Sequence, residues 1–268
     1  MKKAKLLFKI IFFDIDGTLT DKATGEIVPS AFEAVHKLEE AGHFVSINTG
    51  RAAYKAEWFR AKYDFDNMVC NGGHGIFYQG KMQENRPIDR EMALRLYHQA
   101  DEQGYGLLFS LDDSYKVYGK DFKFYDQVGL RNEPTKYIID DAFDPDKASE
   151  IFKMYIPVPP EKEAELTCLQ ELGDYGMGYI RFDPKYLCIQ VDEKKAGILR
   201  MLEYAGGTIE DVVVFGDDYN DMDMFDPDFY CIAMGNACQP LKDMADYVTD
   251  ANVDDGIYNA CVKHGWIG

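Results

Sequence analysis

The stretch FFDIDGTLTD, residues 12–21, ends an apolar run with two carboxylates separated by one residue. The run before it, KIIFF at residues 9–13, has the continuous apolar pattern that is typical of a strand buried on both faces. Asp14 and Asp16 then fall at, or just beyond, the carboxyl end of this strand. In open α/β sheets that edge is where ligands bind, so the two aspartates are the first candidates for a functional site.

Further along the chain, short apolar segments alternate with segments of helical periodicity. Strands are predicted at residues 44–51, 67–73, 211–218 and 229–235. Helices are predicted at residues 29–42, 194–204 and 256–264, and another follows the strand at 44–51 and ends at about residue 63. Strands that alternate with helices indicate parallel pairing through right-handed crossovers. We therefore expect an α/β fold whose sheet is mostly parallel.

A different pattern separates the two alternating regions. A hairpin is predicted around Gln79 and Gly80, and the segment after it mixes strand-like and helix-like pieces, including a helix expected at residues 161–172. This mixture favours an α+β domain inserted into the first one. The expected boundaries give a core domain of residues 1–83 and 190–268 and an inserted domain of residues 84–189.

Composition and charge exclude several classes of partner. The chain is 46% apolar and 28% charged, as ordinary globular proteins are, and its formal net charge is −18. Such a charge repels the phosphates of nucleic acids and anionic membrane surfaces. We therefore expect neither a nucleic acid nor a membrane as a partner.

Two features of the sequence bear on the compartment. The start, MKKAKLLFKIIFF, superficially resembles a secretory signal, but Lys9 interrupts its apolar part and no small-x-small cleavage site follows. The six cysteines form no CxxC pair, and several lie in apolar runs, as reduced core thiols do. No run approaches the roughly 18 apolar residues of a membrane span. These features favour a cytoplasmic location.

Four carboxylates follow predicted strands and would meet if those strands were neighbours: Asp14, Asp16, Asp217 and Asp221. For a single segment, polar residues at a strand end are equally well explained by a wet loop. Several converging carboxylates, however, require a compensating cation, and Mg²⁺ suits them because it takes oxygen ligands and accepts a phosphate oxygen. One carboxylate could then attack phosphorus and a second could move the proton.

Phosphoryl transfer also needs hydrogen-bond donors and a positive charge from the protein. Thr49 and the backbone amides around Gly50 offer donors at the end of the second predicted strand. Lys194 or Lys195 offers the charge, although two lysines at the start of a helix more often form a solvated face.

DIDGT, TGR, KKAGIL and GDDYND, in this order, resemble the four motifs of the haloacid dehalogenase-like phosphatase superfamily. The insertion between the second and third motifs is similar to the α+β cap of its Cof-type, subclass IIB members. The resemblance implies a Rossmann-like three-layer core. It also implies Asp14 as nucleophile, Asp16 as general acid and base, and Thr49 as a phosphate-binding hydroxyl.

The same resemblance assigns further site residues. It implies Mg²⁺ as cofactor, held by Asp14, Asp217 and the backbone carbonyl of Asp16. Lys195 is preferred to Lys194 as the charge-neutralising catalytic lysine, because KAGIL lies where relatives carry Lys-Gly-x-Ala-Leu, although Ala196 replaces the glycine. The substrate-binding candidates are Thr49, Gly50, Lys195 and Asn220, and the candidates for a supporting role are Asp221, Arg51 and Asn71.

The leading hypothesis is a Mg²⁺-dependent phosphatase that acts on small phosphorylated metabolites, sugar phosphates first, through an aspartyl-phosphate intermediate. One alternative is a phosphotransferase or phosphomutase acting on sugar phosphates. Another is a signalling or binding module that is phosphorylated on aspartate, but Asp16 argues against it, because a group placed to activate water shortens the life of an acyl phosphate. The expected partner is a small phosphate ester, and both a monomer and a homodimer remain open.

Overall fold

The computed structural model describes residues 8–268, apart from the side chain of Phe182. Residues 1–7, which begin the segment weighed above as a secretory signal, lie outside the described residues. The chain divides into two compact units. The core unit comprises the described residues up to Arg51, Ala56–Glu84 and Glu193–Gly268, and the inserted unit comprises Ala52–Lys55 and Asn85–Asp192. The division thus falls at residues 85 and 192, where the sequence suggested 84 and 189, and it adds a short piece of the chain before residue 56.

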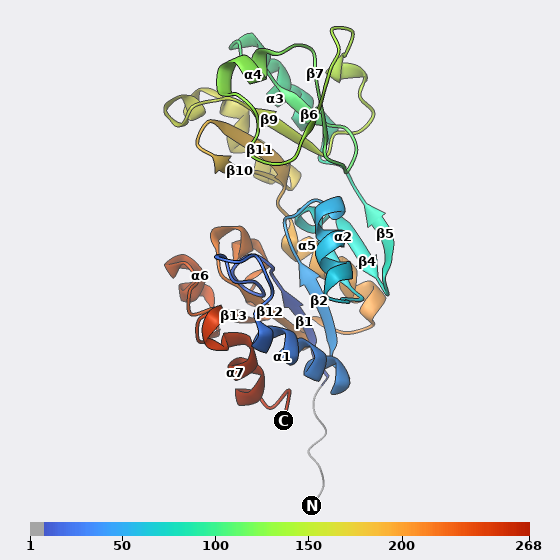
Figure 1. Ribbon diagram of the computed structural model, residues 1–268, viewed down its shortest axis with the longest axis vertical. Helices are drawn as coiled ribbons and strands as arrows, with labels where there is room; N and C mark the ends of the chain where they lie inside the picture. Colours follow the sequence, from blue (N-terminus) through green and yellow to red (C-terminus); the bar gives the residue numbers. More distant parts are fainter. Residues whose placement is uncertain (1–7) are drawn as a thin grey trace, which may run out of the picture. The chain divides into compact units, whose positions relative to one another are not determined.

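An eight-stranded sheet forms the centre of the core unit, in the order β14-β13-β12-β1-β2-β3-β4-β5 (Figure 1). Its strands are β1 Ile10–Phe13, β2 Phe44–Asn48, β3 Met68–Cys70, β4 Gly75–Tyr78, β5 Lys81–Asn85, β12 Val212–Gly216, β13 Tyr230–Ala233 and β14 Tyr247–Val248. Pairing is parallel from β14 to β3, and β4 is antiparallel to β3. The predicted hairpin joins β4 to β5 through Gln79 and Gly80, whose positive φ values of 49° and 73° are those of a tight type I′ turn.

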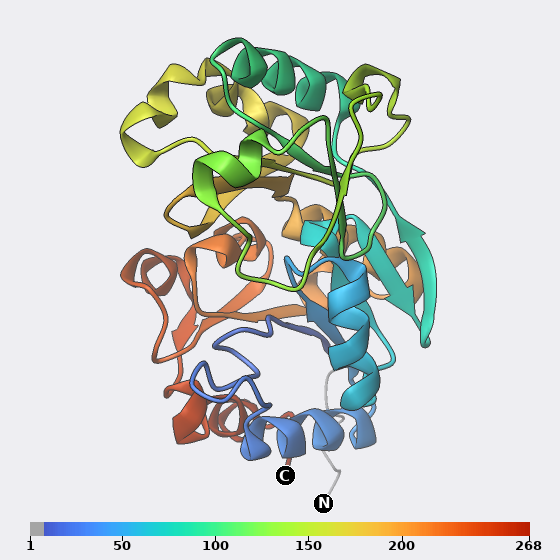
Figure 2. The same cartoon turned by 45° about the horizontal axis from the view of Figure 1, so that its top comes forward.

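Helices cover both faces of this sheet. The α-helices are α1 Pro29–Glu40, α2 Ala53–Lys62, α5 Lys194–Ala205, α6 Gln239–Met244 and α7 Gly256–Lys263, and short 3₁₀ helices include η1 Asn71–Gly73 and η6 Tyr219–Met224. On one face α5, η6 and α6 pack on alternate side chains of β1, β12 and β13. On the other face α1 lies beside α7 (Figures 1 and 2). It also contacts the residue that follows α2, because the rings of Phe32 and Tyr63 are 5.9 Å apart.

The buried strands explain the layering. All four residues of β1 and all five of β12 are buried, because helices cover both faces and leave no side of these strands to solvent. α1 begins at Pro29, where proline suits the first helical turn, and it buries Ala31, Ala34, Val35 and Leu38 as one stripe. The expected α/β fold with a three-layer core and a mostly parallel sheet is confirmed.

The inserted unit has its own six-stranded sheet, in the order β10-β11-β9-β6-β7-β8. Its strands are β6 Leu108–Ser110, β7 Lys116–Gly119, β8 Lys136–Ile139, β9 Lys153–Ile156, β10 Met177–Asp183 and β11 Tyr186–Val191. Its helices are α3 Arg90–Glu102, α4 Lys123–Val128 and the 3₁₀ helices η2 Pro145–Lys147, η3 Pro160–Glu165 and η4 Thr167–Tyr175. All strand pairs are antiparallel except β7 with β8.

The helix predicted at residues 161–172 is wrong in kind. The segment forms two successive 3₁₀ helices, η3 and η4, that part at Leu166, whose ψ of 80° breaks the helical backbone. Leu166, Cys168, Leu169 and Leu172 are buried in the core that these turns share with α3, so tertiary packing decides the local backbone. Helical spacing of apolar residues could not distinguish the two geometries over so short a segment.

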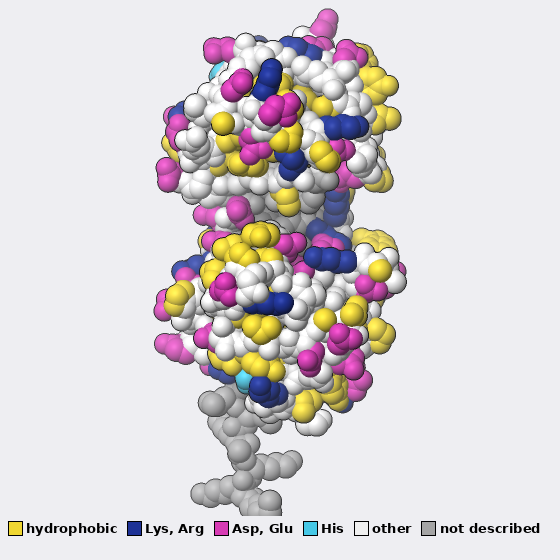
Figure 3. All heavy atoms as spheres, turned by 90° about the vertical axis from the view of Figure 1, so that its left-hand side faces the viewer, with side chains coloured by type: hydrophobic (Ala, Val, Ile, Leu, Met, Phe, Trp, Pro, Cys, Tyr) yellow, Lys and Arg dark blue, Asp and Glu magenta, His cyan; other side chains and the backbone are white. Residues whose placement is uncertain are grey.

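The surface agrees with the acidic composition. On the face that Figure 3 shows, Asp and Glu side chains are scattered over both units and Lys and Arg are interspersed among them. All six cysteines are free, and five of them are buried. Within residues 8–268, no helix combines the length and the apolar character that crossing a bilayer requires.

Candidate active site

The three strand ends singled out in the sequence are neighbours in the core sheet. β1 lies between β12 and β2, with Phe13 paired to Phe215 on one side and to Ile47 on the other. Because all three strands run parallel, the residues that follow them share one edge of the sheet. Asp14, Thr49 and Asp217 therefore come from adjacent strand ends.

The turn after β1 ties the ends of β1 and β12 together. The Asp16 backbone amide donates a hydrogen bond to Oδ2 of Asp14 at 2.9 Å, and the Thr18 hydroxyl donates one to Oδ1 of Asp217 at 3.0 Å. Gly17 has a φ of +97°, a left-handed conformation that favours glycine, and a Cβ on it would overlap with Oδ2 of Asp217. A glycine is thus required for the chain to pass this close to Asp217.

Three aspartates form the centre of the site: Asp14, Asp217 and Asp221. All three are buried, and one carboxylate oxygen from each lies within 4.8 Å of the others. Burial, and next the charge of Asp221, raises the pKa of Asp14 to about 6, despite the opposing charge of Lys194. Burial also raises the pKa of Asp217. The cluster is therefore short of positive charge.

This cluster fits a divalent cation. Oδ2 of Asp217 is buried and accepts no regular hydrogen bond, and the charge it meets is that of the exposed Lys22, so another cation can take that place. The donors are all carboxylate oxygens, the ligand type that Mg²⁺ prefers. Asp14 and Asp217 would hold such an ion, and Asp221 lies close enough to contribute.

The lysine of the site is Lys194, and the sequence-based preference for Lys195 is wrong about which ammonium reaches the carboxylates. Lys194 is fully buried, with its Nζ 2.8 Å from Oδ1 of Asp14 and 2.6 Å from Oδ1 of Asp221. Burial by itself would lower the pKa of Lys194, but the two carboxylates outweigh it and raise that pKa. Lys195 instead pairs with Asp226.

Helical geometry explains the correction. The buried stripe of α5 consists of Lys194, Gly197, Ile198, Met201 and Leu202. These spacings of three and four residues belong to one helix face, so a residue at position 194 points inward with Ile198 and one at 195 does not. The same periodicity was present in the sequence and would have identified Lys194.

The start of α5 is fixed to the core unit by its own backbone. The Glu193 amide donates a hydrogen bond to the Gly72 carbonyl at 2.8 Å. A Cβ on Gly73 would overlap with the Glu193 carbonyl oxygen, and one on Gly197 would lie 2.7 Å from Cα of Gly73. Close backbone contact therefore sets the position from which Lys194 extends.

Asp16 and Arg51 form a second, more exposed pair. Arg51 donates to both carboxylate oxygens of Asp16, with its Nε 2.9 Å from Oδ2. The Asp16 side chain is 57% exposed, in contrast to the buried Asp14. The structure thus places Arg51, predicted in a supporting role, against the residue predicted to move protons.

The second strand end is built mainly by backbone contacts. Thr49 is buried, and its Oγ1 accepts a hydrogen bond from the Arg51 amide at 3.2 Å. Asn71 is also buried, at a positive φ of 50°, and its amide donates to the Arg51 carbonyl. Gly50, between Thr49 and Arg51, is only partly buried. These residues shape the loop that carries Arg51.

Asn220 and Asp221 differ in burial. Asn220 is exposed, whereas Asp221 is completely buried. Oδ2 of Asp221 accepts hydrogen bonds from the amides of Asp217 and Asp218, at 2.8 and 3.1 Å, and Oδ1 accepts one from Lys194. Asp221, expected among the converging carboxylates and assigned a supporting role by the resemblance, lies at the centre of the charged cluster, whereas Asn220 stays a candidate for substrate binding.

Sequence reasoning missed Lys22. Its Nζ lies 2.8 Å from Oδ2 of Asp217 and 3.6 Å from Oδ2 of Asp218. No motif marks this lysine, since it follows the FFDIDGTLTD stretch in a surface turn that contains Ala23, Thr24 and Gly25. Only the folded turn brings it to the cluster.

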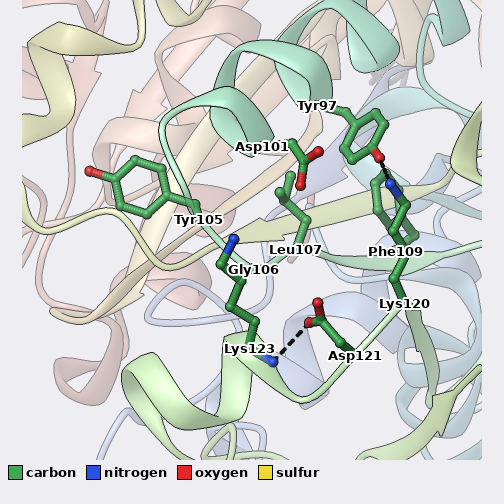
Figure 4. Close-up of a pocket in the computed structure, with 9 residues that line it drawn as sticks. All are labelled: Tyr97, Asp101, Tyr105, Gly106, Leu107, Phe109, Lys120, Asp121 and Lys123. Carbon is green, nitrogen blue, oxygen red and sulfur yellow. Dashed lines mark hydrogen bonds between the residues drawn. The ribbon is translucent and has the colours of Figure 1, made fainter. Parts of the chain in front are cut away.

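A separate pocket lies in the inserted unit (Figure 4). It has a volume of about 270 Å³, part of it open to solvent, and is lined by Tyr97, Asp101, Tyr105, Gly106, Leu107, Phe109, Lys120, Asp121 and Lys123. Lys120 donates to the Tyr97 hydroxyl, and the Lys123 amide donates to Asp121 at 2.9 Å. None of the site residues predicted from the sequence lines this pocket.

A family model described as haloacid dehalogenase-like hydrolase matches residues 11–261. The chain belongs to this family. In this haloacid dehalogenase-like hydrolase, the four motif segments lie after β1, after β2, at the start of α5 and after β12. That arrangement gathers Asp14, Thr49, Lys194 and Asp217 in the core unit.

Known proteins of similar length resemble the whole chain. YkrA of Bacillus subtilis (strain 168), provisionally named as a phosphatase, is 29% identical over 258 residues, which covers 96% of this chain and 98% of that protein. The pyridoxal phosphate phosphatase YbhA of Escherichia coli (strain K12) is 26% identical over 275 residues, with 96% and 98% covered. A solved structure of BT4131, described as a subclass IIB sugar phosphatase, aligns with a TM-score of 0.73 at 24% identity and covers 97% of this chain and 100% of that one. The last likeness shows the shared fold.

Proposed function

We propose that this haloacid dehalogenase-like hydrolase is a Mg²⁺-dependent phosphatase that hydrolyses small phosphate monoesters, with sugar phosphates as the preferred candidates. The reaction would pass through a phosphoenzyme formed on Asp14. The coarser statement, a phosphatase of this family, follows from the family model and from relatives of similar length that are named as phosphatases. The cation, the substrate class and the residue roles are the proposal.

The observation that carries the proposal is the contact of buried Asp14 with Lys194, beside Asp217 and Asp221. A carboxylate without a proton is needed to attack phosphorus, and Lys194 favours that ionised form. Asp14 and Asp217 would hold the cation, which when bound would neutralise charge on the transferring phosphoryl group. Lys194 supplies further positive charge from the protein side.

Asp16 takes the role of general acid and base in this proposal. The Asp14 and Asp16 carboxylates extend from the same turn, and the hydrogen bond from the Asp16 amide to Asp14 fixes their spacing. Asp16 is exposed, so its carboxyl group can exchange a proton with a leaving group or an attacking water. Arg51 holds its orientation.

The substrate assignment rests on the size and chemistry of the ligands of related proteins. YbhA is named for pyridoxal phosphate and BT4131 is named as a sugar phosphatase, and both ligands are small phosphate monoesters. The cytoplasmic location is supported by the six free cysteines, since reduced thiols persist in that compartment.

The test is a turnover screen of the purified protein with Mg²⁺ against phosphorylated sugars, pyridoxal phosphate and nucleotides. We expect phosphate release that EDTA abolishes reversibly, and on the order of a 10³-fold or larger loss in Asp14→Asn. Substantial activity in that variant would refute the mechanism. Transfer of phosphate to a second sugar in place of water would instead identify a phosphotransferase, and a phosphoaspartate that persists for hours without turnover would identify a signalling module.

A further inference from the structure

The contact between Lys22 and Asp217 differs in burial from the two ion pairs that Lys194 makes. The Lys22 side chain is 58% exposed and the Asp217 side chain is 1% exposed, whereas Lys194 and its two partners are all buried. A flexible, mostly solvated lysine thus reaches in to the last free oxygen of a buried carboxylate.

The two oxygens of Asp217 have different partners. Nζ of Lys22 lies 2.8 Å from Oδ2 of Asp217, but Oδ2 accepts no hydrogen bond of normal angle. Oδ1 of the same carboxylate, in contrast, accepts a regular bond from Thr18 at 3.0 Å. Asp217 is therefore held by Thr18 through one oxygen and by Lys22 through the other.

The path of the lysine shows how closely its stem enters the site. A Cβ on Gly17 would overlap with Cε of Lys22 and with Oδ2 of Asp217. The end of the Lys22 side chain thus lies directly over the Gly17 backbone, beside the oxygen that fits a divalent cation. An ammonium group and a divalent ion at that oxygen would repel each other strongly at such short range.

Charge counting gives the same result. Three ionised carboxylates with Lys194 and Lys22 leave one net negative charge in the cluster. A divalent ion in place of Lys22 would leave none among these groups. Lys22 would then keep Asp218, whose Oδ2 lies 3.6 Å from its Nζ, as a partner outside the buried cluster.

We propose that Lys22 is a competing internal cation, which binds Oδ2 of Asp217 and must leave it before a divalent metal ion can bind there. This inference rests on the metal site of the proposed function. Lys22 would set a lower limit to the metal concentration at which the site fills. Its exposed stem lets it turn into solvent without any change in the buried residues.

The test measures metal binding directly, without turnover. Calorimetric titration of the EDTA-treated, dialysed full-length protein with Mg²⁺, and separately with Mn²⁺, compares the natural chain with Lys22→Met and Lys22→Gln. Breaking an ion pair of about 1 kcal/mol corresponds to roughly a fivefold change in affinity, so both variants should bind the metal about fivefold more tightly. Without metal, both should melt at a slightly lower temperature, because Asp217 loses its cation.

Lys62→Met is the matched control. Lys62 pairs with Glu26, which follows the turn that carries Lys22. The substitution removes the same positive charge from a lysine that does not contact the aspartate cluster. Equal tightening in this control would show a general charge effect and would overturn the inference, as would unchanged or weaker binding in the Lys22 variants. No metal binding by any form would refute the metal site itself, and with it both proposals.

Discussion

Nζ of Lys194 lies 2.8 Å from Oδ1 of Asp14, and the two residues are 180 positions apart in the chain. Along the sequence, the long segment of the inserted unit, Asn85–Asp192, lies between these two residues. The site therefore exists only when the strand that carries Asp14 and the helix that carries Lys194 have both docked on the same core. Catalytic geometry and the folding of the core unit are linked through this pair.

Lys194→Met should lower kcat by roughly 10²–10³-fold, because the transferring group loses its protein cation. It should also destabilise the fold by about 3–5 kcal/mol, since removal of one partner leaves buried carboxylates without compensation. Lys195→Met should change both quantities less, because its ion pair with Asp226 is only partly buried and lies outside the cluster. Steady-state kinetics and urea denaturation of the two variants provide the comparison, and a greater loss in the Lys195 variant would restore the original preference.

The stability of the metal-free chain should fall as pH rises from about 4 to about 6. Burial raises the pKa of Asp14 from its ordinary 3.8 to about 6, so in this window the folded chain binds more protons than the unfolded chain. The free energy of unfolding then decreases with pH, by up to roughly 3 kcal/mol from this one group. Asp14→Asn should remove that contribution.

Thermal melts in EDTA across this window check the pH prediction. The difference in melting temperature, variant minus natural chain, should increase with pH and level off above about 6. Parallel curves for the two proteins would show that Asp14 does not titrate there.

Gly17→Ala should damage the site more than an ordinary glycine replacement does. Its Cβ would overlap with Lys22 and Asp217, in addition to the cost of a left-handed φ. Gly25→Ala is the control, because Gly25 has a φ of +71° but no atom within 4 Å of the added Cβ. Both should lose about 1–2 kcal/mol from the backbone alone, and only Gly17→Ala should also lose metal affinity in calorimetry.

Arg51→Gln should lower kcat by roughly 10-fold to 100-fold, since Asp16 loses the group that orients it for proton transfer. Arg51→Lys should be intermediate, because lysine keeps the charge but not the two-pronged contact. Metal affinity should remain unchanged in both variants. A parallel loss of metal affinity would mean that Arg51 acts through Asp14 or Asp217 instead.

The carboxyl ends of β1, β2 and β12 were predictable because each strand carries an unambiguous apolar run. Parallel strands then leave only one edge at which Asp14, Thr49 and Asp217 could meet. The alternation of strands and helices predicted the mostly parallel sheet, and the family resemblance implied the three-layer core. Buried apolar strands that alternate with helices are therefore sufficient to predict which strand ends form this site.

Other features depended on information that the sequence patterns did not contain. The convergence of Asp221 with the other carboxylates was predicted, but its complete burial depends on the short 3₁₀ helix η6, which turns it inward while its neighbour Asn220 faces solvent. Lys22 reaches Asp217 only through the fold of a surface turn. Lys194 is different, since the stripe it shares with Ile198 and Met201 was legible in the sequence.

The hydrogen bond from Glu193 to Gly72 has a consequence for the modular construction of the chain. The inserted unit ends at Asp192, one residue before this anchor, and Lys194 begins α5 one residue after it. A change in the long segment of the inserted unit, which ends at Asp192, therefore does not include the hydrogen bond that positions Lys194. The anchor that positions Lys194 thus belongs to the core unit and not to the insertion.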